Sequence, residues 1–440
     1  MPLFGRRPSS PPAADVARRP SLPEPPAPGA DGLRSMADHR AYLLSCMEEL
    51  PAFSQPLLDA LGLCIAEDVS AAVSLPGFDN SAMDGYAVLA EDVEQATAGS
   101  PVTLPVVGEV AAGQSATHRL TFGTAMKVMT GAPLPPGATA VVPYENTDRG
   151  TEDVRINAPS LEGQHIRRRG EDVAEGDRVI TAGQRLGARD LGLLAAVGRD
   201  QVLARPRPRV AVVSTGSELV EPGSPLVSQG QIYDSNSFLL AAAARAAGAQ
   251  VFRVGLVSDD PDRVKQLITD QLLRADLILT TGGVSQGDYD IIKAVMPDLG
   301  DTDFAAVAMQ PGKPQGFGLI GEQRVPMIML PGNPVSAFVS FEAFVRPAIR
   351  KLMGATPYGR PAVQARATHA ITSIAGRQQF ARGIVSTEPD GSRRVELAGG
   401  HGSHLLGDLS RANALVVLDA GTDFVASGDV VDVWLLDEAS

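Results

Sequence analysis

The sequence has only two cysteines, Cys46 and Cys64, among its 440 residues. This number excludes a disulfide-stabilised scaffold and a structural zinc site made of cysteines alone, and it fits a reducing cytosol. No apolar run reaches the ~18 residues that a membrane-spanning helix requires. The N-terminal segment also lacks the apolar core of a secretory signal peptide. We therefore expect a cytoplasmic protein that does not enter the membrane.

Positive charge is in deficit. The 38 lysines and arginines are outnumbered by 51 aspartates and glutamates, which gives a net charge of −13 at pH 7. This balance argues against nucleic acid as a main partner. An acidic protein binds an anion only where arginine, lysine or a metal ion changes the local charge.

Several catalytic motifs are missing. There is no P-loop, no dinucleotide-binding glycine motif followed by a ribose-binding acid, and no nucleophile elbow. Four histidines, His165, His369, His401 and His404, do not have the spacing of a zinc site. These absences favour chemistry in which a metal ion, backbone amides and carboxylates position the substrate without a covalent nucleophile.

Length and composition predict an α/β protein of roughly two to four domains. Residues 1–33 are rich in proline, alanine and arginine, and we expect this tail to be disordered. A first helix should begin near Ser35 and could pack on the sheet domain. The expected domains are an elongated linker domain (34–69 and 165–207), an inserted small β domain (70–164), an α/β domain (208–356) and a C-terminal, barrel-like β domain (357–440).

The clearest fold signal lies in residues 208–350, where apolar strand patterns alternate with helical patterns. Strands are expected at residues 210–213, 251–257, 277–281 and 325–330, each followed by a helical segment. This alternation predicts a doubly wound parallel sheet. Ligands bind such sheets beyond the carboxyl ends of the strands. Because polar or glycine-rich residues follow all four strands, the sequence predicts one pocket formed by four turns.

The turn after residues 277–281 contains two glycines, Gly282 and Gly283, and two acids, Asp288 and Asp290. A glycine-rich turn at a helix N-terminus exposes N–H groups that bind phosphate. The acids repel bare phosphate, so the combination is understandable if a divalent cation bridges carboxylate and phosphate oxygens. The alternative is a plain strand–turn–helix connection with aspartate as the helix cap.

Three other polar segments stand out. Residues 77–86 are too polar for a core strand and too rich in aspartate, asparagine and glycine for a helix. The arginines at 167–169 could form either a solvated turn or an anion contact. Gly402 and Ser403 could form either an anion-binding nest or a hairpin turn.

Taken together, seven motifs resemble the MoeA/gephyrin-E family of molybdopterin molybdenumtransferases. They lie at residues 76–87, 129–133, 166–172, 214–219, 282–285, 311–314 and 330–336. The resemblance runs from about residue 35 to the C-terminus. Its specificity comes from the order and spacing of the motifs, since no single motif is decisive.

The resemblance implies an elongated homodimer with four subdomains. It would insert molybdate into the dithiolene of adenylylated molybdopterin, with Mg²⁺, and release AMP. The implied catalytic residues are Asp84, Thr130, Asp172, Glu218 and Asp290, of which Glu218 and Asp290 would bind Mg²⁺ and the first three would face the partner's sheet domain. The implied binding residues are Asp260, Gly282, Gly283 and Ser285 at the nucleotide end, and Lys313, Pro314, Ser336, Arg382 and Ser403 near molybdate.

The chain departs from the family pattern at Gln310, where many relatives carry the first lysine of Lys-Pro-Gly-Lys-Pro. Gln310 could donate neutral hydrogen bonds, molybdate could bind more weakly, or another oxyanion such as tungstate could be preferred. Two other functions stay open: an adenylyltransferase acting one step earlier, and a non-catalytic pterin-binding scaffold. The long insert and the C-terminal β domain argue against the first, and the intact acids against the second. Contacts with the upstream adenylyltransferase and with downstream molybdoenzymes are also expected.

Overall fold

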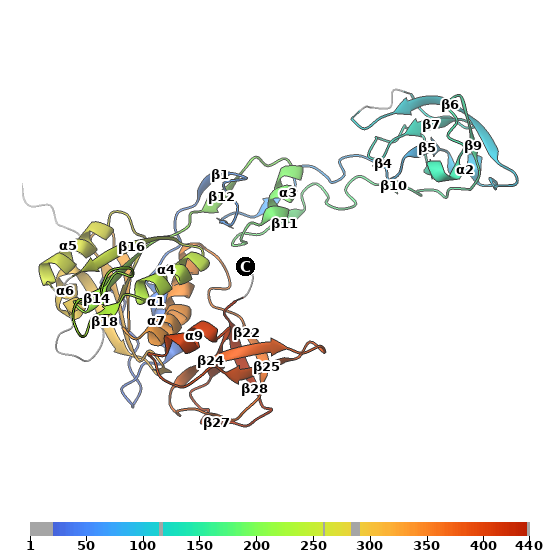
Figure 1. Ribbon diagram of the computed structural model, residues 1–440. Coiled ribbons are helices and arrows are strands. Elements are labelled where there is room, and N and C mark those ends of the chain that lie inside the picture. Colours follow the sequence, from blue (N-terminus) through green and yellow to red (C-terminus); the bar gives the residue numbers. More distant parts are fainter. Residues whose placement is uncertain (1–20, 114–117, 258–259, 283–290, 438–440) are drawn as a thin grey trace, which may run out of the picture. The chain divides into compact units, whose positions relative to one another are not determined.

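A computed structural model of the chain describes residues 21–113, 118–257, 260–282 and 291–437 (Figure 1). These residues form two compact units. The first, here called the sheet–barrel unit, consists of Met1–Leu50 and Arg207–Ser440, and the second, the inserted unit, consists of Pro51–Pro206. No helix in the described ranges is long and apolar enough to cross a membrane.

A six-stranded sheet, in the order β16-β13-β17-β21-β20-β18, forms the first half of the sheet–barrel unit. Four strands are parallel, as predicted: β13 (Arg209–Thr215), β16 (Gln250–Val257), β17 (Leu277–Thr281) and β21 (Val325–Leu330). Two further strands, which the sequence did not predict, lie at one edge of the sheet. There β20 (Pro314–Ile320) and β18 (Gly300–Ala306) run antiparallel. Their glycines and aspartates have low strand propensity, which hid both strands in the sequence.

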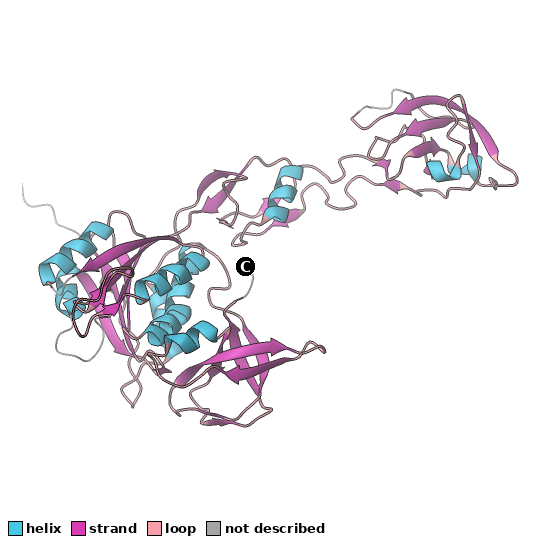
Figure 2. Ribbon diagram, viewed as in Figure 1, coloured by secondary structure: helices cyan, strands magenta, loops and turns pink. Residues whose placement is uncertain are grey.

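Helices cover both faces of this sheet, as in a doubly wound fold (Figure 2). On one face, α5 (Pro261–Gln271) and α6 (Ile291–Leu299) bury Val264, Ile268 and Ile292 in a cluster with Val213 and Ile278 of the strands. On the other face lie α4 (Asn236–Ala246) and α7 (Pro334–Ser340). The helix predicted for residues 335–350 is present, but a π-helix (Phe341–Val345) joins α7 to α8 (Arg346–Leu352).

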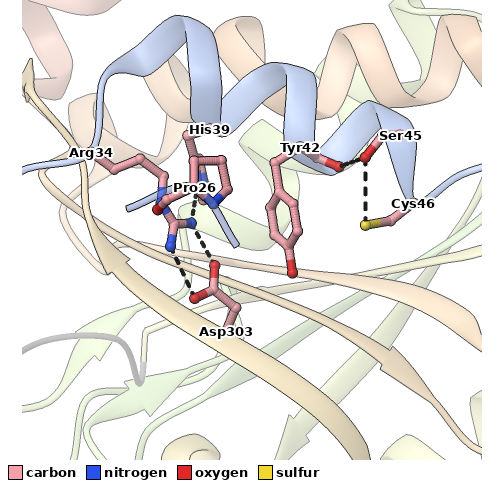
Figure 3. Close-up of polar contacts among 7 residues, drawn as sticks. All are labelled: Pro26, Arg34, His39, Tyr42, Ser45, Cys46 and Asp303. Atoms are coloured by element: carbon pink, nitrogen blue, oxygen red, sulfur yellow. Dashed lines mark hydrogen bonds and ion pairs between the residues drawn. The ribbon is translucent and has the colours of Figure 1, made fainter. Parts of the chain in front are cut away.

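The first helix, α1 (Met36–Ser45), packs on this unit near α8 and β18. Ser35 caps it by accepting a hydrogen bond from the Asp38 amide, 3.0 Å away, as a helix beginning near Ser35 requires. Figure 3 shows the contact with the sheet: Arg34 pairs with Asp303 of β18 at 2.6 Å and donates to His39 Nδ1 at 3.1 Å. Burial, assisted by the Arg34 charge, lowers the pKa of His39 to about 3, so this histidine is neutral at pH 7.

A closed five-stranded barrel forms the second half of the sheet–barrel unit. Its strands pair in the order β24-β25-β22-β28-β26, and β26 returns to β24, which confirms the barrel-like prediction. Their bounds are β22 Ala362–Ala367, β24 Gln378–Thr387, β25 Arg393–Leu397, β26 Ala414–Leu418 and β28 Val430–Leu435. A short strand from the sheet half, β19 (Met309–Gln310), pairs in parallel with β24 and so joins the two halves. The helix α9 (Leu406–Arg411) follows the loop after β25, and β23 (Ile371–Thr372) pairs with β27 (Phe424–Val425).

The inserted unit contains a five-stranded sheet in the order β8-β5-β7-β6-β9. The strands are β5 Gly85–Val88, β6 Val102–Val110, β7 Ala125–Val128, β8 Ala140–Pro143 and β9 Asp153–Ile156. The expectation that residues 77–86 contain no core strand was wrong: the short strand β4 (Asn80–Ser81) is buried, and β5, which begins at Gly85, is fully buried. Gly85 permits this packing, since a Cβ there would lie 2.0 Å from the carbonyl oxygen of Val142.

Short elements complete the inserted unit. Its strand pairs are β1 (Phe53–Pro56) with β12 (Gln201–Arg205), β2 (Cys64–Ile65) with β12, β3 (Val69–Ser70) with β11 (Arg178–Ile180), and β4 (Asn80–Ser81) with β10 (Ile166–Arg167). Its helices are α2 (Ala90–Val93), α3 (Ala188–Ala196) and the 3-10 helix Tyr144–Asn146. In the sheet–barrel unit, β14 (Leu219–Val220) pairs with β15 (Ile232–Tyr233).

Candidate functional site

Two of the strand-end turns that the sequence singled out lie against each other. Gly282, which follows β17, donates its N–H to the carbonyl oxygen of Leu330 at the end of β21, 3.1 Å away. Asn236 joins the same two turns, donating from Nδ2 to Thr281 Oγ1 at 2.8 Å and to the Gly332 carbonyl oxygen at 2.6 Å. Gly282 has φ +87°, which favours glycine, and a side chain there would lie 3.4 Å from the Thr215 carbonyl oxygen of β13.

The rest of the glycine-rich turn, including Gly283, Ser285, Asp288 and Asp290, lies outside the described residues. Two buried atoms beside the described part have no hydrogen-bond partner: Asn236 Oδ1 and Thr280 Oγ1. Buried polar atoms are nearly always paired with protein, water or ligand. Two orphaned polar atoms therefore lie where the parallel strands end.

The two acids predicted beside this turn differ in their surroundings. Glu218 is exposed beyond β13, and among the described residues its carboxylate forms no hydrogen bond or ion pair. The carboxylate lies close to Gly216: a Cβ on that residue would be 2.6 Å from Glu218 Oε2. Asp260 instead caps α5, accepting from the amides of Asp262 at 3.0 Å and Arg263 at 3.4 Å. Within the described ranges, no three metal-binding side chains gather in one place, so Glu218 stands as a single free carboxylate.

In the inserted unit, Asp84 and Thr130 are brought together at the surface. Thr130 donates to Asp84 Oδ1 from its amide and from its hydroxyl, each over 2.7 Å. These two hydrogen bonds, the backbone one foremost, lower the pKa of Asp84. Asp172 is also exposed, and its amide donates to the Leu75 carbonyl oxygen at 3.1 Å.

The consecutive arginines of the inserted unit contact its own carboxylates. Arg168 pairs with Asp79 at 2.7 Å, and Arg169 pairs with Glu175 at 3.0 Å, with all four side chains exposed. The Arg169 amide also donates to Asp79, at 2.8 Å. These contacts favour the solvated-turn interpretation of residues 167–169 over an anion contact.

A cavity of about 330 Å³ lies between the sheet half and the barrel half of the sheet–barrel unit. Arg382 of β24 lines it and is only 6% exposed. Its guanidinium donates to the carbonyl oxygens of Gly400 and Gly402, the latter at 2.9 Å, and burial lowers the pKa of Arg382. The lining residues are Gln310, Pro311, Val335, Thr372, Ser373, Ile374, Gln379, Phe380, Ala381, Arg382, Leu397, Ala398, Gly399, Gly400 and His401.

Three buried side chains of this cavity carry a polar atom without a partner. They are Arg382 Nε, Ser373 Oγ and Gln379 Oε1. Ser373 is 8% exposed and Gln379 is 6% exposed, so bulk water does not satisfy these atoms. A buried polar atom left unpaired costs about 1–3 kcal/mol. Three such atoms around one cavity indicate a site for a polar ligand or for ordered water.

The other residues predicted near molybdate lie beside the cavity and do not line it. Ser403 accepts from Asn333 Nδ2 at 3.0 Å, and its carbonyl oxygen accepts from the amide of Val335 at 3.1 Å. Ser336 is buried in the first turn of α7. Pro314 is the first residue of β20 and Lys313 directly precedes it, close in sequence to the lining residue Gln310.

Sequence reasoning missed Ser373 and Gln379. Gln379 could have been identified from the sequence. Together with Arg382 it is polar, whereas the other residues in the buried part of this strand are mainly apolar. Two polar residues in the buried part of a strand require partners inside the protein. Ser373 gives no such signal, because its exposed neighbours read as a surface loop.

Comparisons with known proteins agree with these observations. Residues 34–198 match the MoeA N-terminal region (domain I and II), residues 211–351 a probable molybdopterin binding domain, and residues 364–436 the MoeA C-terminal region (domain IV). A protein of Mycobacterium tuberculosis named molybdopterin molybdenumtransferase 2 is 44% identical over 91% of this chain and 99% of its own length. One of Haemophilus influenzae, named molybdopterin molybdenumtransferase, is 37% identical over 88% of this chain and 95% of its own.

A solved structure is also similar. The crystal structure of the molybdopterin biosynthesis moeA protein from Pyrococcus horikoshii matches with a TM-score of 0.77 and 30% identity. It covers 92% of this chain and 100% of its own. The relatives are thus matched along nearly their whole length, through both units of the fold. The chain belongs to the MoeA family of molybdopterin molybdenumtransferases.

Proposed function

We propose that this chain inserts molybdate into the dithiolene of adenylylated molybdopterin and releases AMP, as a step of molybdenum cofactor biosynthesis. The observation that carries the proposal is the cavity around Arg382, a buried cation to which no carboxylate of the described residues is hydrogen-bonded. It occurs in a chain whose full-length relatives are named molybdopterin molybdenumtransferases. A dianionic oxyanion is the kind of ligand that such a cavity stabilises.

At the molybdate end, Arg382 supplies the charge and Ser373 supplies a hydroxyl donor, whereas the unpartnered Oε1 of Gln379 can only accept a hydrogen bond. Lys313, Pro314, Ser336 and Ser403 adjoin this end and complete its surroundings. Hydrogen bonds to a charged ligand stabilise it by about 1.5–3 kcal/mol each when they replace no better partner. Two of the orphaned atoms, Arg382 Nε and Ser373 Oγ, are such donors, because no described group of the protein satisfies them.

At the nucleotide end, the turns beyond β17 and β21 bind the phosphates through backbone N–H groups. Gly282, Gly283 and Ser285 would form this cradle, with Asp260 at its side. Glu218 fits a magnesium ligand, because its carboxylate is exposed and unpaired among the described residues, and Mg²⁺ prefers oxygen ligands. Asp290 would be the second carboxylate, and the bound ion would offset the charge of the phosphates.

The proposal includes a homodimer in the cytoplasm. Asp84, Thr130 and Asp172 lie in the inserted unit, and Glu218 and Asp290 lie in the other. We assign the first group to a cleft that is completed by the sheet–barrel unit of a partner subunit. The exposure of Asp84 and Thr130 fits this role, since neither side chain is covered by its own unit.

The direct test is the release of AMP from adenylylated molybdopterin, measured with and without molybdate. The proposal predicts AMP release that requires molybdate and Mg²⁺, together with molybdenum retained on the pterin. An adenylyltransferase would instead form the adenylylated pterin from ATP. A non-catalytic scaffold would bind the pterin and release no AMP. Either of these results, obtained with a folded protein, would refute the transferase assignment.

A further inference from the structure

Gln310 lies at the edge of the Arg382 cavity, in the place where many relatives have lysine, and the structure gives it a cationic neighbour. Arg377 donates from Nη1 to Gln310 Oε1 over 3.3 Å. Both side chains are half-buried. Among the described residues, Arg377 pairs with no carboxylate, so its positive charge is not neutralised within that part of the chain.

The backbone fixes the placement of this pair. Gln310 in β19 and Gln379 in β24 are register partners of a parallel pairing, and both line the cavity. The Gln378 amide also donates to the Ala308 carbonyl oxygen at 2.9 Å, which holds the start of β24 against the sheet half. Arg377 comes directly before this anchored start. Arg377 is thus the last residue of the exposed turn before β24, and the anchored start of that strand places its backbone close to β19.

The chemistry of the contact sets the orientation of the Gln310 amide. A guanidinium only donates hydrogen bonds, so the atom that faces Arg377 must be the carbonyl oxygen Oε1. The amide nitrogen Nε2 then points away from Arg377 with two N–H groups. No described residue accepts a hydrogen bond from Nε2. Gln310 thus offers neutral hydrogen-bond donors at the cavity, and Arg377 lies at the opposite, Oε1 side of its amide group.

We propose that Arg377 is a positioning and specificity-determining residue for the oxyanion, acting through Gln310 in place of the lysine of the relatives. It orients the amide donors of Gln310 and supplies positive charge to the cavity from its far side. A half-buried charge acts through a lower effective dielectric than an exposed one, so its field at the cavity is less screened. This inference rests on the proposed function, because it takes molybdate as the ligand of the cavity.

The test compares molybdate affinity, measured by calorimetry with sodium molybdate, among variants that separate charge from shape. Arg377→Gln keeps a hydrogen-bond donor but removes the charge, and we expect it to weaken molybdate binding by about tenfold. Arg377→Lys keeps the charge and should stay within about threefold of the wild type. Arg366→Gln is the control: Arg366 is exposed on β22 of the same barrel, donates to the Gly428 carbonyl oxygen at 3.1 Å, and does not line the cavity.

A double variant tests whether a lysine at position 310 can replace the charge of Arg377 in molybdate binding. In the Arg377→Gln background, Gln310→Lys should restore molybdate affinity to near the wild-type value. In the wild-type background the same change should help less, because the new lysine would lie beside Arg377 and be repelled by it. A residue with a purely structural role would not be rescued by a charge at position 310, and its loss would weaken nucleotide binding as well.

The possible outcomes separate this inference from the proposed function. If the wild type binds molybdate and Arg377→Gln binds it equally well, Arg377 has no such role and the transferase assignment stands. If the wild type does not bind molybdate, both are overturned. Should Arg377→Gln fail to fold, the comparison of Gln310→Lys with Gln310→Lys/Arg377→Met decides, since repulsion between two cations predicts a weaker gain than a lysine beside a neutral side chain. Equal affinity of these two variants and of the wild type would contradict the inference.

Discussion

The two units of the protein carry polar sites of opposite character. In the inserted unit, Asp84 is exposed and already accepts two hydrogen bonds from Thr130. In the sheet–barrel unit, Arg382, Ser373 and Gln379 are buried and each retains an atom without a partner. In the first site the Asp84 carboxylate already has hydrogen-bond partners within the protein, whereas in the second site three buried polar atoms have none among the described residues. A buried, unsatisfied group is therefore the better indicator of where a ligand binds.

The largest expected effect concerns how the two units cooperate. We predict that Asp84→Ala and Asp290→Ala each lower the turnover of adenylylated molybdopterin by roughly 10²–10³-fold, because each removes a carboxylate from the proposed cleft. Mixed dimers of the two inactive variants should regain activity, since one of their two clefts is intact. The measurement is AMP release by verified heterodimers. No recovery would show that the site is built within one chain, and wild-type turnover by Asp290→Ala would remove Asp290 from the mechanism.

A second prediction concerns the cation beside the cavity. Lys313→Ala should weaken molybdate binding by roughly tenfold to a hundredfold, because it removes a charge near the oxyanion. Nucleotide affinity should change little, since the Gly282 turn holds the other end of the site. Parallel titrations with molybdate and with AMP check this. The opposite pattern, with nucleotide binding lost and molybdate binding kept, would place the oxyanion elsewhere.

The two units should also differ in their response to acid. His39 is buried with a pKa lowered to about 3, below its ordinary value of about 6.5, so folding favours the neutral ring. Its contribution to stability is complete above about pH 6.5 and is lost as the pH falls toward 3. In the inserted unit, the lowered pKa values belong to carboxylates such as Asp84 and Asp79. Their contribution to stability is lost only below about pH 4, where carboxylates in the unfolded chain become protonated.

We therefore predict that the sheet–barrel unit weakens first as the pH falls below about 6.5. His39→Gln keeps an acceptor for Arg34 but does not titrate, and it should flatten this dependence. Denaturant unfolding at several pH values, followed by the fluorescence of Trp434, reports on this unit, because Trp434 is the only tryptophan and lies in β28. An identical pH dependence in the wild type and in His39→Gln would contradict the assignment.

The smallest effect compares one buried serine from each unit. The hydroxyl of Ser160, in the inserted unit, donates to the Val141 carbonyl oxygen at 2.9 Å, whereas the hydroxyl of Ser373 in the cavity has no partner among the described residues. Ser160→Ala should lower the free energy of unfolding by about 1–2 kcal/mol, because it leaves a buried carbonyl oxygen without this donor. Ser373→Ala should change it by less than about 0.5 kcal/mol and yet weaken molybdate binding. Equal destabilisation by both changes would mean that Ser373 is satisfied in the folded protein.

The sequence predicts the regular parts of this fold better than its irregular ones. Apolar runs such as residues 277–281 and 325–330 indicated buried parallel strands, and both are present as β17 and β21. The antiparallel strands β18 and β20 were missed because glycine and aspartate conceal their strand pattern. The strand at Gly85 was missed because the motif around it is polar, and only its contact with Val142 explains the choice of glycine.

The candidate site was predicted in part for a similar reason. The family resemblance pointed to Arg382, and the glycine-rich turn was recognised from its own residues. The Arg377–Gln310 contact depends on how β19 pairs with β24, and this pairing joins residues 69 positions apart in the sequence, such as Gln310 and Gln379. Nothing local in the sequence encodes such a pairing, so the neighbour of Gln310 could be found only in three dimensions.

The central claim is that the Arg382 cavity binds the oxyanion, and direct calorimetric titration with molybdate tests it. Wild type should bind, and Arg382→Met should lose about a hundredfold or more in affinity, because it removes a buried cation and its Nε donor while filling similar space. Nucleotide affinity should be unchanged in the same preparation, which controls for folding. Undiminished molybdate binding by a folded Arg382→Met variant would contradict the account.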